Sequence, residues 1–518
     1  MKVGMYNRWL ATMGGGEMYS LSIAEILSQH HEVQVISHTP VSREDAAQRL
    51  NLKLENVEFV SIPFCTNEEL KPLTGQYDFF INASFMDYIP SIAPHSANIV
   101  FFPTPLGGLQ TSRLRYRLGW AIKRWFMLPT LAEGYQRTAQ YPDHPFTVVL
   151  SAPIRIKLPA SSKPYPVSLT LVNIEAQIGT VRMRLDGQAL LQATSIAPGQ
   201  SAPFHFEVPE SNKPVHELVI ELDGSDKERL SSPCLGLDGL TVHTPRFKFF
   251  QSIFGNKLRP YGLRFQLLPL PNSSFQDYLD TYDALWAISV YTQTWVRKYW
   301  NRDSSILFPP VDVKKFHAAP KTHKILNVGR FFAGAHTKKH LEMIRAFRAM
   351  VDGGLKDWEL YLVGGSRSGD VHQKYLADVI SAAEGYPIHV LPDLPYSDLV
   401  PLYNESSIYW HASGFGEDEN RDPIKFEHFG ITTVEAMAAG CVPVVIGKGG
   451  QPEIVQHGKN GYLWDSLEKL QEWTQKLIED PGLRQQLAEA AIRDSVKYSL
   501  EEFQLRLNEL LKEINLDS

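Results

Sequence analysis

Two glutamates stand on either side of one glycine in the stretch FEHFGITTVEAMAAG, which runs from Phe426 to Gly440. Glu427 precedes Gly430 and Glu435 follows it, and the residues after this glycine have helical composition. The spacing fits three kinds of structure: a capped helix with solvated acids, the acid pair of a hydrolase, and a seat for a phosphorylated ligand.

A helix that starts at Gly430 would suit a phosphate group. Helix starts have backbone N–H groups without partners and carry positive potential, and both favour an anion. Thr432 and Thr433 add hydroxyl donors in the first turn. Glu435 follows about a turn later, where a carboxylate accepts hydrogen bonds from ribose hydroxyls. Glu427 precedes the helix and can reach another part of the same ligand, such as sugar hydroxyls.

Three cations follow a predicted strand in the stretch NVGRFFAGAHTKKH. Arg330 stands at the end of that strand, and Lys338 and Lys339 stand at the start of the next predicted helix. An arginine grips two phosphate oxygens at once and a lysine acts as a point charge, so the pattern suits a diphosphate. Such cations also stabilise the charge that develops on a departing phosphate. A group of surface charges at a loop is the alternative.

A glycine loop follows the first predicted strand, in the stretch MGGGEM that contains Gly15 and Gly16. Its glycines lack the GxGxxG spacing of a dinucleotide fingerprint, so the loop alone is a weak signal. Glycines there allow the backbone to approach a ligand closely. The loop therefore predicts a second wall for the same ligand.

The order of the predicted elements indicates two parallel α/β halves. Residues 1–40 give strand, glycine loop, helix and strand, which is typical of a doubly wound sheet, and the alternation resumes after Arg246. Two such halves predict ligand binding at the carboxyl ends of their strands, in a cleft between them. The predicted boundaries are 1–145 and 246–311 for the N-terminal half with its linker, 312–498 for the C-terminal half, and 499–518 for a last helix that packs back on the N-terminal half.

Residues 146–245 interrupt this alternation. They form runs of alternating apolar and polar residues, such as FTVVLSAPIRIKL and VHELVIELDG, separated by Pro, Gly, Ser and Asp. Short strands at this spacing, with no helix between them, indicate an all-β sandwich inserted in the N-terminal half. Glycan binding, a partner surface and a spacer all stay open for this module, with a glycan or assembly role slightly favoured.

Composition excludes some classes of protein. The 518 residues are 43% hydrophobic with a net charge of −6, which suits a soluble protein with sizeable cores and gives no sign of nucleic-acid binding. The three cysteines are scattered, so we expect no disulfide framework and a cytoplasmic location. Arg8 interrupts the apolar start expected of a signal peptide, and no apolar run predicts a membrane span.

These motifs together resemble glycosyltransferase family 4, whose GT-B architecture has two Rossmann-like domains facing a cleft. The resemblance rests on the two glutamates separated by seven residues, EHFGITTVE, and on the following AMAAGCVPVVIGKGGQPEIVQHGKNGYLW. It extends to NVGRF, KKHLEMIRAF, AISVYTQTWVRKYW, LFPPVD and GGGE, and so to all of the chain except 146–245. EHFGI with VEAMAAG is most similar to the branch of eukaryotic lipid-linked mannosyltransferases and many bacterial polysaccharide enzymes.

The resemblance implies retaining transfer of a sugar from a nucleotide-sugar donor, without a metal or other cofactor. It implies that Arg330 and Lys338 hold the diphosphate and stabilise the leaving group, and that Glu427 contacts the donor sugar. Lys338 is preferred to Lys339 because its spacing to Ala346 fits the family pattern.

The resemblance further implies that Gly430, Ile431 and Thr432 bind the phosphates and that Glu435 binds the ribose. Gly15 and Gly16 would form the facing loop, near the phosphates or the acceptor. No protein nucleophile is then required, because the leaving phosphate itself can help to deprotonate the acceptor hydroxyl.

One position departs from the family pattern. Relatives often carry a histidine at the strand end that faces the transferred sugar, whereas this chain reads VFFPTP with Phe101 at that position. His95 lies six residues earlier and is not its replacement. Either the histidine is dispensable in this branch or the acceptor chemistry differs.

Two basic and aromatic stretches flank the insert, at residues 111–126 and 246–265. Each has five Lys or Arg residues, and neither contains an acid. Such segments can contact an anionic membrane surface, grip a lipid diphosphate or a polysaccharide, or pack as helices whose cations reach outward. A peripheral position on the inner face of the membrane is therefore an alternative to a free cytoplasmic one.

The sequence thus predicts a retaining glycosyltransferase that extends a cell-surface glycan or lipid-linked saccharide. The donor is a GDP- or UDP-sugar, with GDP-mannose slightly favoured. The alternatives are a glycoside hydrolase that uses Glu427 and Glu435, a non-catalytic glycan-binding or scaffold protein derived from a transferase, and an epimerase. We expect no metal site, because the acidic loop from Glu417 to Asp422 and the seventeen histidines lack ligand spacing.

Overall fold

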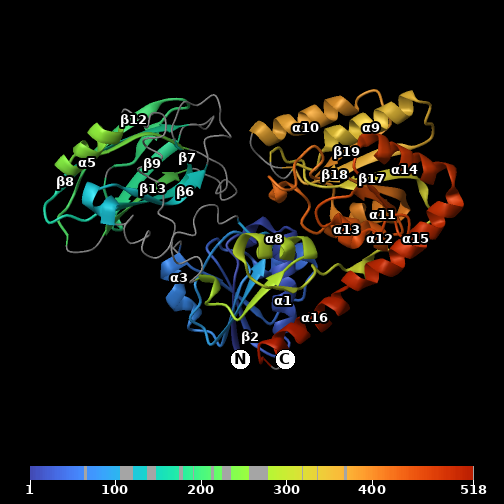
Figure 1. The fold of residues 1–518 in the computed structure, drawn as a ribbon, viewed down its shortest axis with the longest axis horizontal. Coiled ribbons are helices and arrows are strands. Elements are labelled where there is room, and N and C mark those ends of the chain that lie inside the picture. Colours follow the sequence, from blue (N-terminus) through green and yellow to red (C-terminus); the bar gives the residue numbers. More distant parts are fainter. Residues whose placement is uncertain are drawn as a thin grey trace. The chain divides into compact units, whose positions relative to one another are not determined.

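The computed structural model divides into two compact units (Figure 1). The first unit comprises Met1–Pro105 with Tyr278–Ser518, and the second comprises Leu106–Asp277. The residues described are 1–63, 67–104, 121–136, 148–173, 179–190, 192–211, 215–223, 235–255, 278–317, 319–334, 337–366 and 370–516.

The first unit begins with a parallel sheet of seven strands. In spatial order these are β16 (Ser305–Ile306), β15 (Ala284–Ala287), β5 (His95–Val100), β4 (Phe79–Asn82), β1 (Lys2–Tyr6), β2 (Glu32–Ser37) and β3 (Val57–Ser61). All neighbours run parallel. The four residues of β4, FFIN, are all buried, as expected for a parallel strand covered on both faces.

Helices follow the strands of this sheet. Those described are α1 (Gly15–Leu27), α2 (Arg43–Leu50), α3 (Asn67–Thr74) and α8 (Val290–Trp300), with the short 3-10 turn η1 (Leu10–Thr12). Glu17 fixes the start of α1, because its Oε2 accepts hydrogen bonds from Gly14 N at 2.8 Å and from Thr12 Oγ1 at 2.7 Å. The glycine loop therefore has a defined conformation.

A second parallel sheet, of six strands, lies later in the same unit. In spatial order these are β19 (Ile388–Pro392), β18 (Glu359–Gly364), β17 (Thr322–Val328), β20 (Ser406–His411), β21 (Val442–Ile446) and β22 (Tyr462–Trp464). The helices are α9 (His340–Asp352), α10 (Asp370–Ala383), α11 (Tyr396–Glu405), α12 (Ile431–Ala438), α13 (Gln451–Ile454), α14 (Leu467–Glu479) and α15 (Pro481–Ser495). The same half also contains three 3-10 turns, η5 (Val313–Lys315), η6 (Pro423–Lys425) and η7 (Val496–Tyr498).

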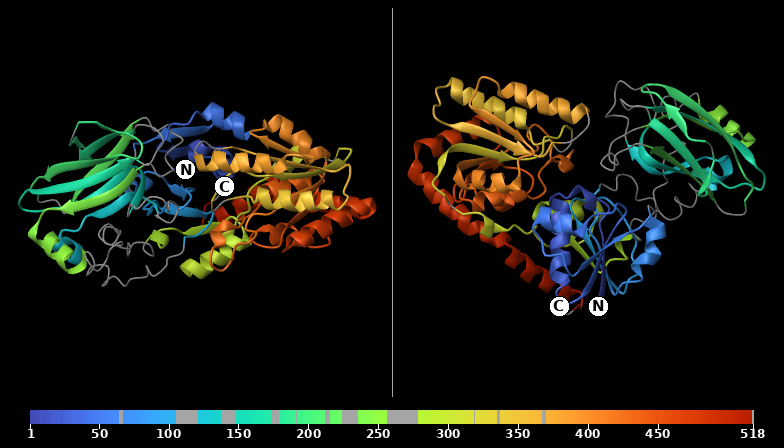
Figure 2. Two further views of the ribbon diagram at one scale, coloured as in Figure 1. Left: turned by 90° about the horizontal axis from the view of Figure 1, so that it is seen from above. Right: turned by 180° about the vertical axis from the view of Figure 1, so that it is seen from behind.

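The last helix, α16 (Leu500–Glu513), begins at Ser499, whose hydroxyl accepts a hydrogen bond from Glu502 N at 3.2 Å. It returns to the first sheet, where the rings of Phe503 and Tyr19 lie 5.5 Å apart and Arg506 Nε donates to Ile306 O. Figure 2 shows this helix in red, ending near the N-terminus of the chain. One core cluster accordingly contains residues from both halves and from α16.

The second unit is built from antiparallel strands. These are β6 (Thr130–Gln136), β7 (Val148–Pro159), β8 (Tyr165–Asn173), β9 (Gly179–Leu185), β10 (Gln188–Ala189), β11 (Thr194–Ile196), β12 (Ser201–Val208), β13 (Val215–Asp223) and β14 (Leu235–Val242). Hydrogen bonds join them into one sheet, in the order β10-β9-β13-β7-β14-β8-β12, with β11 on β9 and β6 on β7. β6 lies before the boundary predicted at residue 146.

The long strand β7 divides this sheet. Its end from Ile154 to Pro159 pairs with β13, whereas its start from Val148 to Leu150 pairs with β14. The strands next to β13 and those next to β14 share one hydrophobic core, and this core contains no residue of the first unit. The two-layer sandwich expected from the sequence stays a prediction. Two helical pieces accompany it, α5 (Pro245–Phe250) with the π-helical turn η4 (Gln251–Gly255), and residues 121–126.

Candidate functional site

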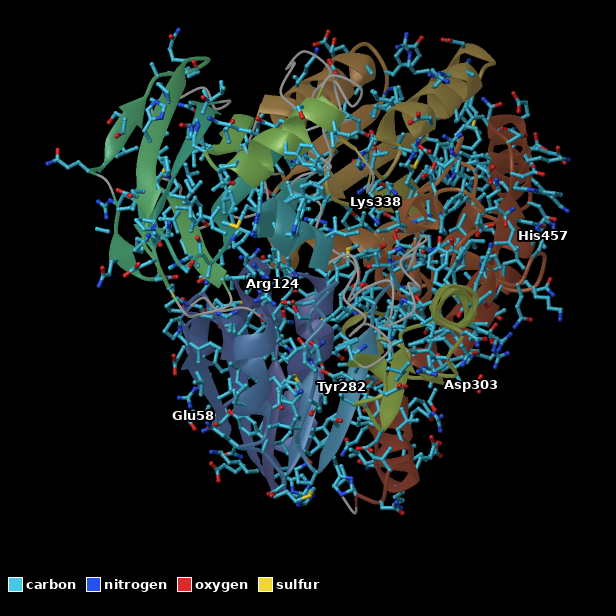
Figure 3. The ribbon with its side chains drawn as sticks, turned by 60° about the vertical axis from the view of Figure 1, so that its left-hand side comes forward. Glu58, Arg124, Tyr282, Asp303, Lys338 and His457 are labelled. Atoms are coloured by element: carbon cyan, nitrogen blue, oxygen red, sulfur yellow. The ribbon has the colours of Figure 1, made fainter. Side chains whose placement is uncertain are left out.

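Glu427 lies between η6 and α12 and has two hydrogen-bond donors. Lys338 Nζ is 2.5 Å from its Oε2, and His411 Nε2 is 3.2 Å from the same oxygen. Burial raises the pKa of Glu427, but the charge of Lys338 and the hydrogen bond from His411 outweigh it and hold this pKa well below its usual range. Glu427 is therefore a carboxylate. Lys338 is labelled in Figure 3.

His411 ends β20 and is 2% exposed. Burial lowers its pKa, although the neighbouring Glu427 raises it, so we expect a neutral ring at pH 7. Facing a carboxylate, Nε2 must carry the proton. Within the part of the chain that the structure describes, Nδ1 has no hydrogen-bond partner. His411 was not among the residues predicted from the sequence, because its only signal was its place at the end of a buried strand.

Arg330 and Lys338 both lie beyond the carboxyl end of β17. Gly329 makes room for Lys338, since a Cβ at this glycine would lie 2.6 Å from Lys338 Cγ. The Arg330 guanidinium lies over the ring of Phe332, with its carbon 4.6 Å from the ring centre. Both predicted cations therefore lie at the end of one strand, and the hydrogen bond to Glu427 comes from Lys338.

Lys339 has a different partner from Lys338. Its Nζ lies 2.9 Å from Glu417, which also pairs with Lys425 at 2.8 Å. The loop from Glu417 to Asp422 is thus tied to two lysines, and its Glu419 accepts a hydrogen bond from Gly449 N. In the described residues, no cluster of three His, Cys, Asp or Glu could hold a metal ion.

The start of α12 depends on Gly430. Its φ is 122°, and a Cβ would lie 2.3 Å from the Gln451 side chain, so this position needs glycine. As at any helix start, the N–H groups of Ile431 and Thr432 have no intrahelical partner. The Thr432 hydroxyl accepts a hydrogen bond from Tyr409 at 2.7 Å, which leaves its own proton to donate.

Glu435 lies one turn into α12 and is half-buried. Tyr403 donates a hydrogen bond to its Oε2 at 2.9 Å. Burial raises the pKa of Glu435 to about 7, although the Tyr403 bond lowers it. Glu427 and Glu435 thus have separate partners and opposite pKa shifts, and the contacts described join neither glutamate to the other.

The glycine loop of the first half touches this helix start. A Cβ on Gly15 would lie 3.2 Å from Ile431 Cδ1, and one on Gly16 would lie 3.5 Å from the Phe101 ring. Phe101 therefore occupies the expected histidine position as a packing residue beside the loop. Nearby, Ser289 Oγ donates to His428 O at 2.6 Å, which ties α8 to the loop before α12. The structure thus brings Gly15, Gly16 and Ile431 together.

Part of the second half is similar to a known family of proteins. Residues 311–494 match the family model of group 1 glycosyl transferases. The chain is 27% identical over 205 residues to a GDP-Man:Man(3)GlcNAc(2)-PP-Dol alpha-1,2-mannosyltransferase of Xenopus laevis, a match that covers 36% of this chain and 39% of that protein. The chain thus spans about two fifths of the length of this curated relative.

Solved structures match almost the whole chain. A glycosyltransferase from Rickettsia africae aligns over 100% of this chain and 99% of its own, with a TM-score of 0.52 and 12% identity. HepE of Anabaena, in complex with UDP, aligns over 99% and 100% with a TM-score of 0.51 and 11% identity. At such identity the likeness shows the fold alone, and it confirms the predicted α/β GT-B fold with parallel sheets.

Proposed function

We propose that this protein is a retaining, metal-independent glycosyltransferase that moves a sugar from a nucleoside-diphosphate sugar to a glycan or lipid-linked saccharide. The observation that carries the proposal is the Lys338–Glu427 ion pair beside the glycine-started helix α12. It combines a cation, a fixed carboxylate and an anion-accepting helix start at the carboxyl ends of parallel strands, where such folds bind ligands.

Each end of the donor has a suitable partner. Arg330 and Lys338 would neutralise the diphosphate, together with the N–H groups at the start of α12 from Gly430 to Thr432. Glu435 would accept hydrogen bonds from the ribose hydroxyls. Glu427, ionised and held by Lys338, would orient the donor sugar through its hydroxyls. Gly15 and Gly16 would close the site from the first half.

In the transfer, the bond between the anomeric carbon and the diphosphate oxygen breaks, and its electrons leave with the nucleoside diphosphate. The acceptor hydroxyl oxygen bonds to the same carbon from the same face, and its proton passes to the departing phosphate oxygen. Arg330 and Lys338 would stabilise the charge on that oxygen, usually the largest contribution to catalysis. No protein nucleophile is needed, which agrees with the engagement of Glu427 by Lys338.

Several observations support the choice of substrates. The curated relatives are named for transfer of mannose from GDP-mannose to a dolichol-linked glycan, which favours GDP-mannose and a lipid-linked acceptor. HepE was solved with UDP, so a UDP-sugar is the second donor to test. No described helix is long and apolar enough to cross a bilayer.

A thermal-shift series with GDP-, UDP-, ADP- and dTDP-sugars tests the proposal. A ligand at about 100 times its dissociation constant adds roughly 2.7 kcal/mol of stability. We expect one donor to stabilise the wild type and to lose this effect in Lys338→Met, whereas Lys339→Met, the matched control, keeps it. If no nucleotide sugar raises the melting temperature of the folded protein, the transferase proposal is wrong, and a scaffold or glycan-binding role replaces it.

The hydrolase alternative predicts another outcome. A hydrolase that uses Glu427 and Glu435 needs one protonated and one ionised acid across a shared sugar. It would release sugar from an oligosaccharide without any nucleotide, and it would lose this activity in Glu435→Gln. The opposite pKa shifts of the two glutamates fit that requirement, but their hydrogen bonds go to different partners and not to each other.

A further inference from the structure

Two helical pieces of the second unit expose large apolar side chains. One is formed by residues 121–126 and the other by α5 with η4. The exposed side chains are Ile122 (46% exposed), Trp125 (50%), Phe249 (51%) and Ile253 (42%). These four, with the exposed cations Arg124, Arg246 and Lys248, form what we call the aromatic–basic patch.

The two pieces are distant in sequence but meet on one surface. The ring centres of Trp125 and Phe249 lie 6.5 Å apart, and the Arg246 guanidinium carbon lies 5.9 Å from the Trp125 ring centre. The rings of Phe126 and Phe249 are stacked, with their centres 6.4 Å apart. Trp125, Phe249 and Arg246 therefore lie side by side although they come from the two different pieces, and Figure 3 labels Arg124, the neighbour of Trp125 in sequence.

The opposite face of these pieces is fixed in the core of the second unit. Phe247 and Phe250 are 0% and 3% exposed and belong to the same core cluster as Met127 and Leu128. One face thus anchors the helices while the other stays outward, as in an amphipathic surface helix. Because Phe247 and Phe250 hold the helix against the core by one face, Phe249 stays exposed to solvent on the other face. Trp125 lies beside it.

The charge of the patch is of one sign. Residues 121–126 and 245–255 contain no aspartate or glutamate, although the whole chain has a net charge of −6. The cations stand beside the apolar side chains, so one binding partner can contact the charges and the apolar side chains at the same time. An anionic lipid surface offers this combination, because phosphates lie at the surface and acyl chains begin just below them.

We propose that the aromatic–basic patch docks the second unit on an anionic lipid bilayer. Trp125 and Phe249 enter the headgroup region with the isoleucines, a depth that aromatic rings favour. Arg124, Arg246 and Lys248 contact the lipid phosphates. The proposal concerns the second unit only and stands whether or not the protein is a glycosyltransferase.

Co-sedimentation of the full chain with vesicles tests this. We expect binding to vesicles of phosphatidylcholine with phosphatidylglycerol, and little binding to phosphatidylcholine alone. Each cation contributes roughly fivefold to such binding, so Arg124→Gln, Arg246→Gln and Lys248→Gln together should weaken it on the order of a hundredfold. The matched control removes three exposed positive charges elsewhere on the module, by Lys163→Gln, Arg182→Gln and Arg184→Gln, and should bind like the wild type.

The apolar half of the patch has its own test. Replacement of Ile122 and Ile253 by serine should weaken binding roughly tenfold without loss of folding, because both side chains are exposed. Brominated acyl chains should also quench more tryptophan fluorescence in the wild type than in Trp125→Phe, since Trp125 is the tryptophan of the patch.

Three results would overturn the proposal. One is equal vesicle binding by the patch variant and the charge-matched control. Another is no binding of the folded wild type to anionic vesicles. The third is binding to a soluble polyanion such as heparin, lost in the same variant, while the vesicles stay unbound, which would assign the patch to a polysaccharide or nucleic acid.

Discussion

At the residue scale, Glu427 is held by a charged donor and a neutral one. Lys338 compensates its charge, whereas His411 adds direction, because a ring fixed in the core at 2% exposure donates along one line. A carboxylate with only the flexible lysine beside it would sample more rotamers. His411 is therefore a positioning residue for Glu427 in the proposed reaction.

Substitution of His411 tests this role. His411→Leu removes a hydrogen bond to a charged group, worth about 1.5–3 kcal/mol, so we expect kcat/KM to fall roughly tenfold to a hundredfold. His411→Gln keeps an N–H donor near the Nε2 position and should recover most of the loss. Initial rates of nucleotide release measure both. If His411→Leu and His411→Gln release nucleotide at the same rate, the hydrogen bond to Glu427 has no role in the reaction and His411 serves only in packing.

The raised pKa of Glu435 predicts a pH dependence of donor binding. Burial raises this pKa to about 7, so the free protein holds a protonated Glu435 below pH 7 and a carboxylate above it. If the carboxylate accepts the ribose hydroxyls, affinity falls roughly tenfold from pH 8 to pH 6, because the competent fraction falls. Calorimetric titration should show this slope in the wild type and a flat profile in Glu435→Gln. The same slope in the variant would remove Glu435 from the proposed site.

At the scale of elements, α8 of the first half is capped by a residue of the second half. Glu453, in α13, accepts hydrogen bonds from Val290 N and Tyr291 N at 2.7 and 2.6 Å. Burial raises the pKa of Glu453 to about 7 and outweighs these two N–H groups at the helix start, which lower it. Together with the hydrogen bond from Ser289 Oγ to His428 O, this contact joins the two halves of the first unit close to α12.

Loss of this cap should weaken the whole first unit. We expect Glu453→Ala to lower the free energy of unfolding by about 1–2 kcal/mol at neutral pH, measured by urea denaturation. Glu468→Ala is the control, because Glu468 is an exposed acid in the first turn of α14 and should change stability by less than about 0.5 kcal/mol. Similar effects of both substitutions would show that the cap adds nothing.

The elements themselves were the most predictable feature of this chain. Buried parallel strands such as β4 and β21 are mostly apolar, so the sequence pattern identifies them. Gly430 was also predicted as a helix start, and its positive φ explains why glycine stands there. The partners of Glu427 were harder to predict. His411 comes from another strand end, and its role depends on which buried atoms meet after folding, which no local spacing encodes.

At the scale of the molecule, the second unit is inserted between neighbouring points of the first. Tyr88 donates a hydrogen bond to the Thr104 hydroxyl, and its ring lies 5.4 Å from that of Tyr278. Thr104 and Tyr278 stand on either side of the insertion, so a few residues can join the two ends. The hydrophobic core of the second unit also shares no residue with the clusters of the first.

Replacement of residues 106–277 by a short Gly-Ser linker should therefore leave the first unit folded. We expect the shortened protein to bind its nucleotide sugar within about twofold of the full chain, because each residue of the proposed donor site lies in the first unit. It should lose binding to anionic vesicles, and scanning calorimetry should show one unfolding transition fewer. If donor binding disappears while the shortened protein stays folded, the second unit supplies part of the donor site. If vesicle binding persists, the membrane contact belongs to the first unit.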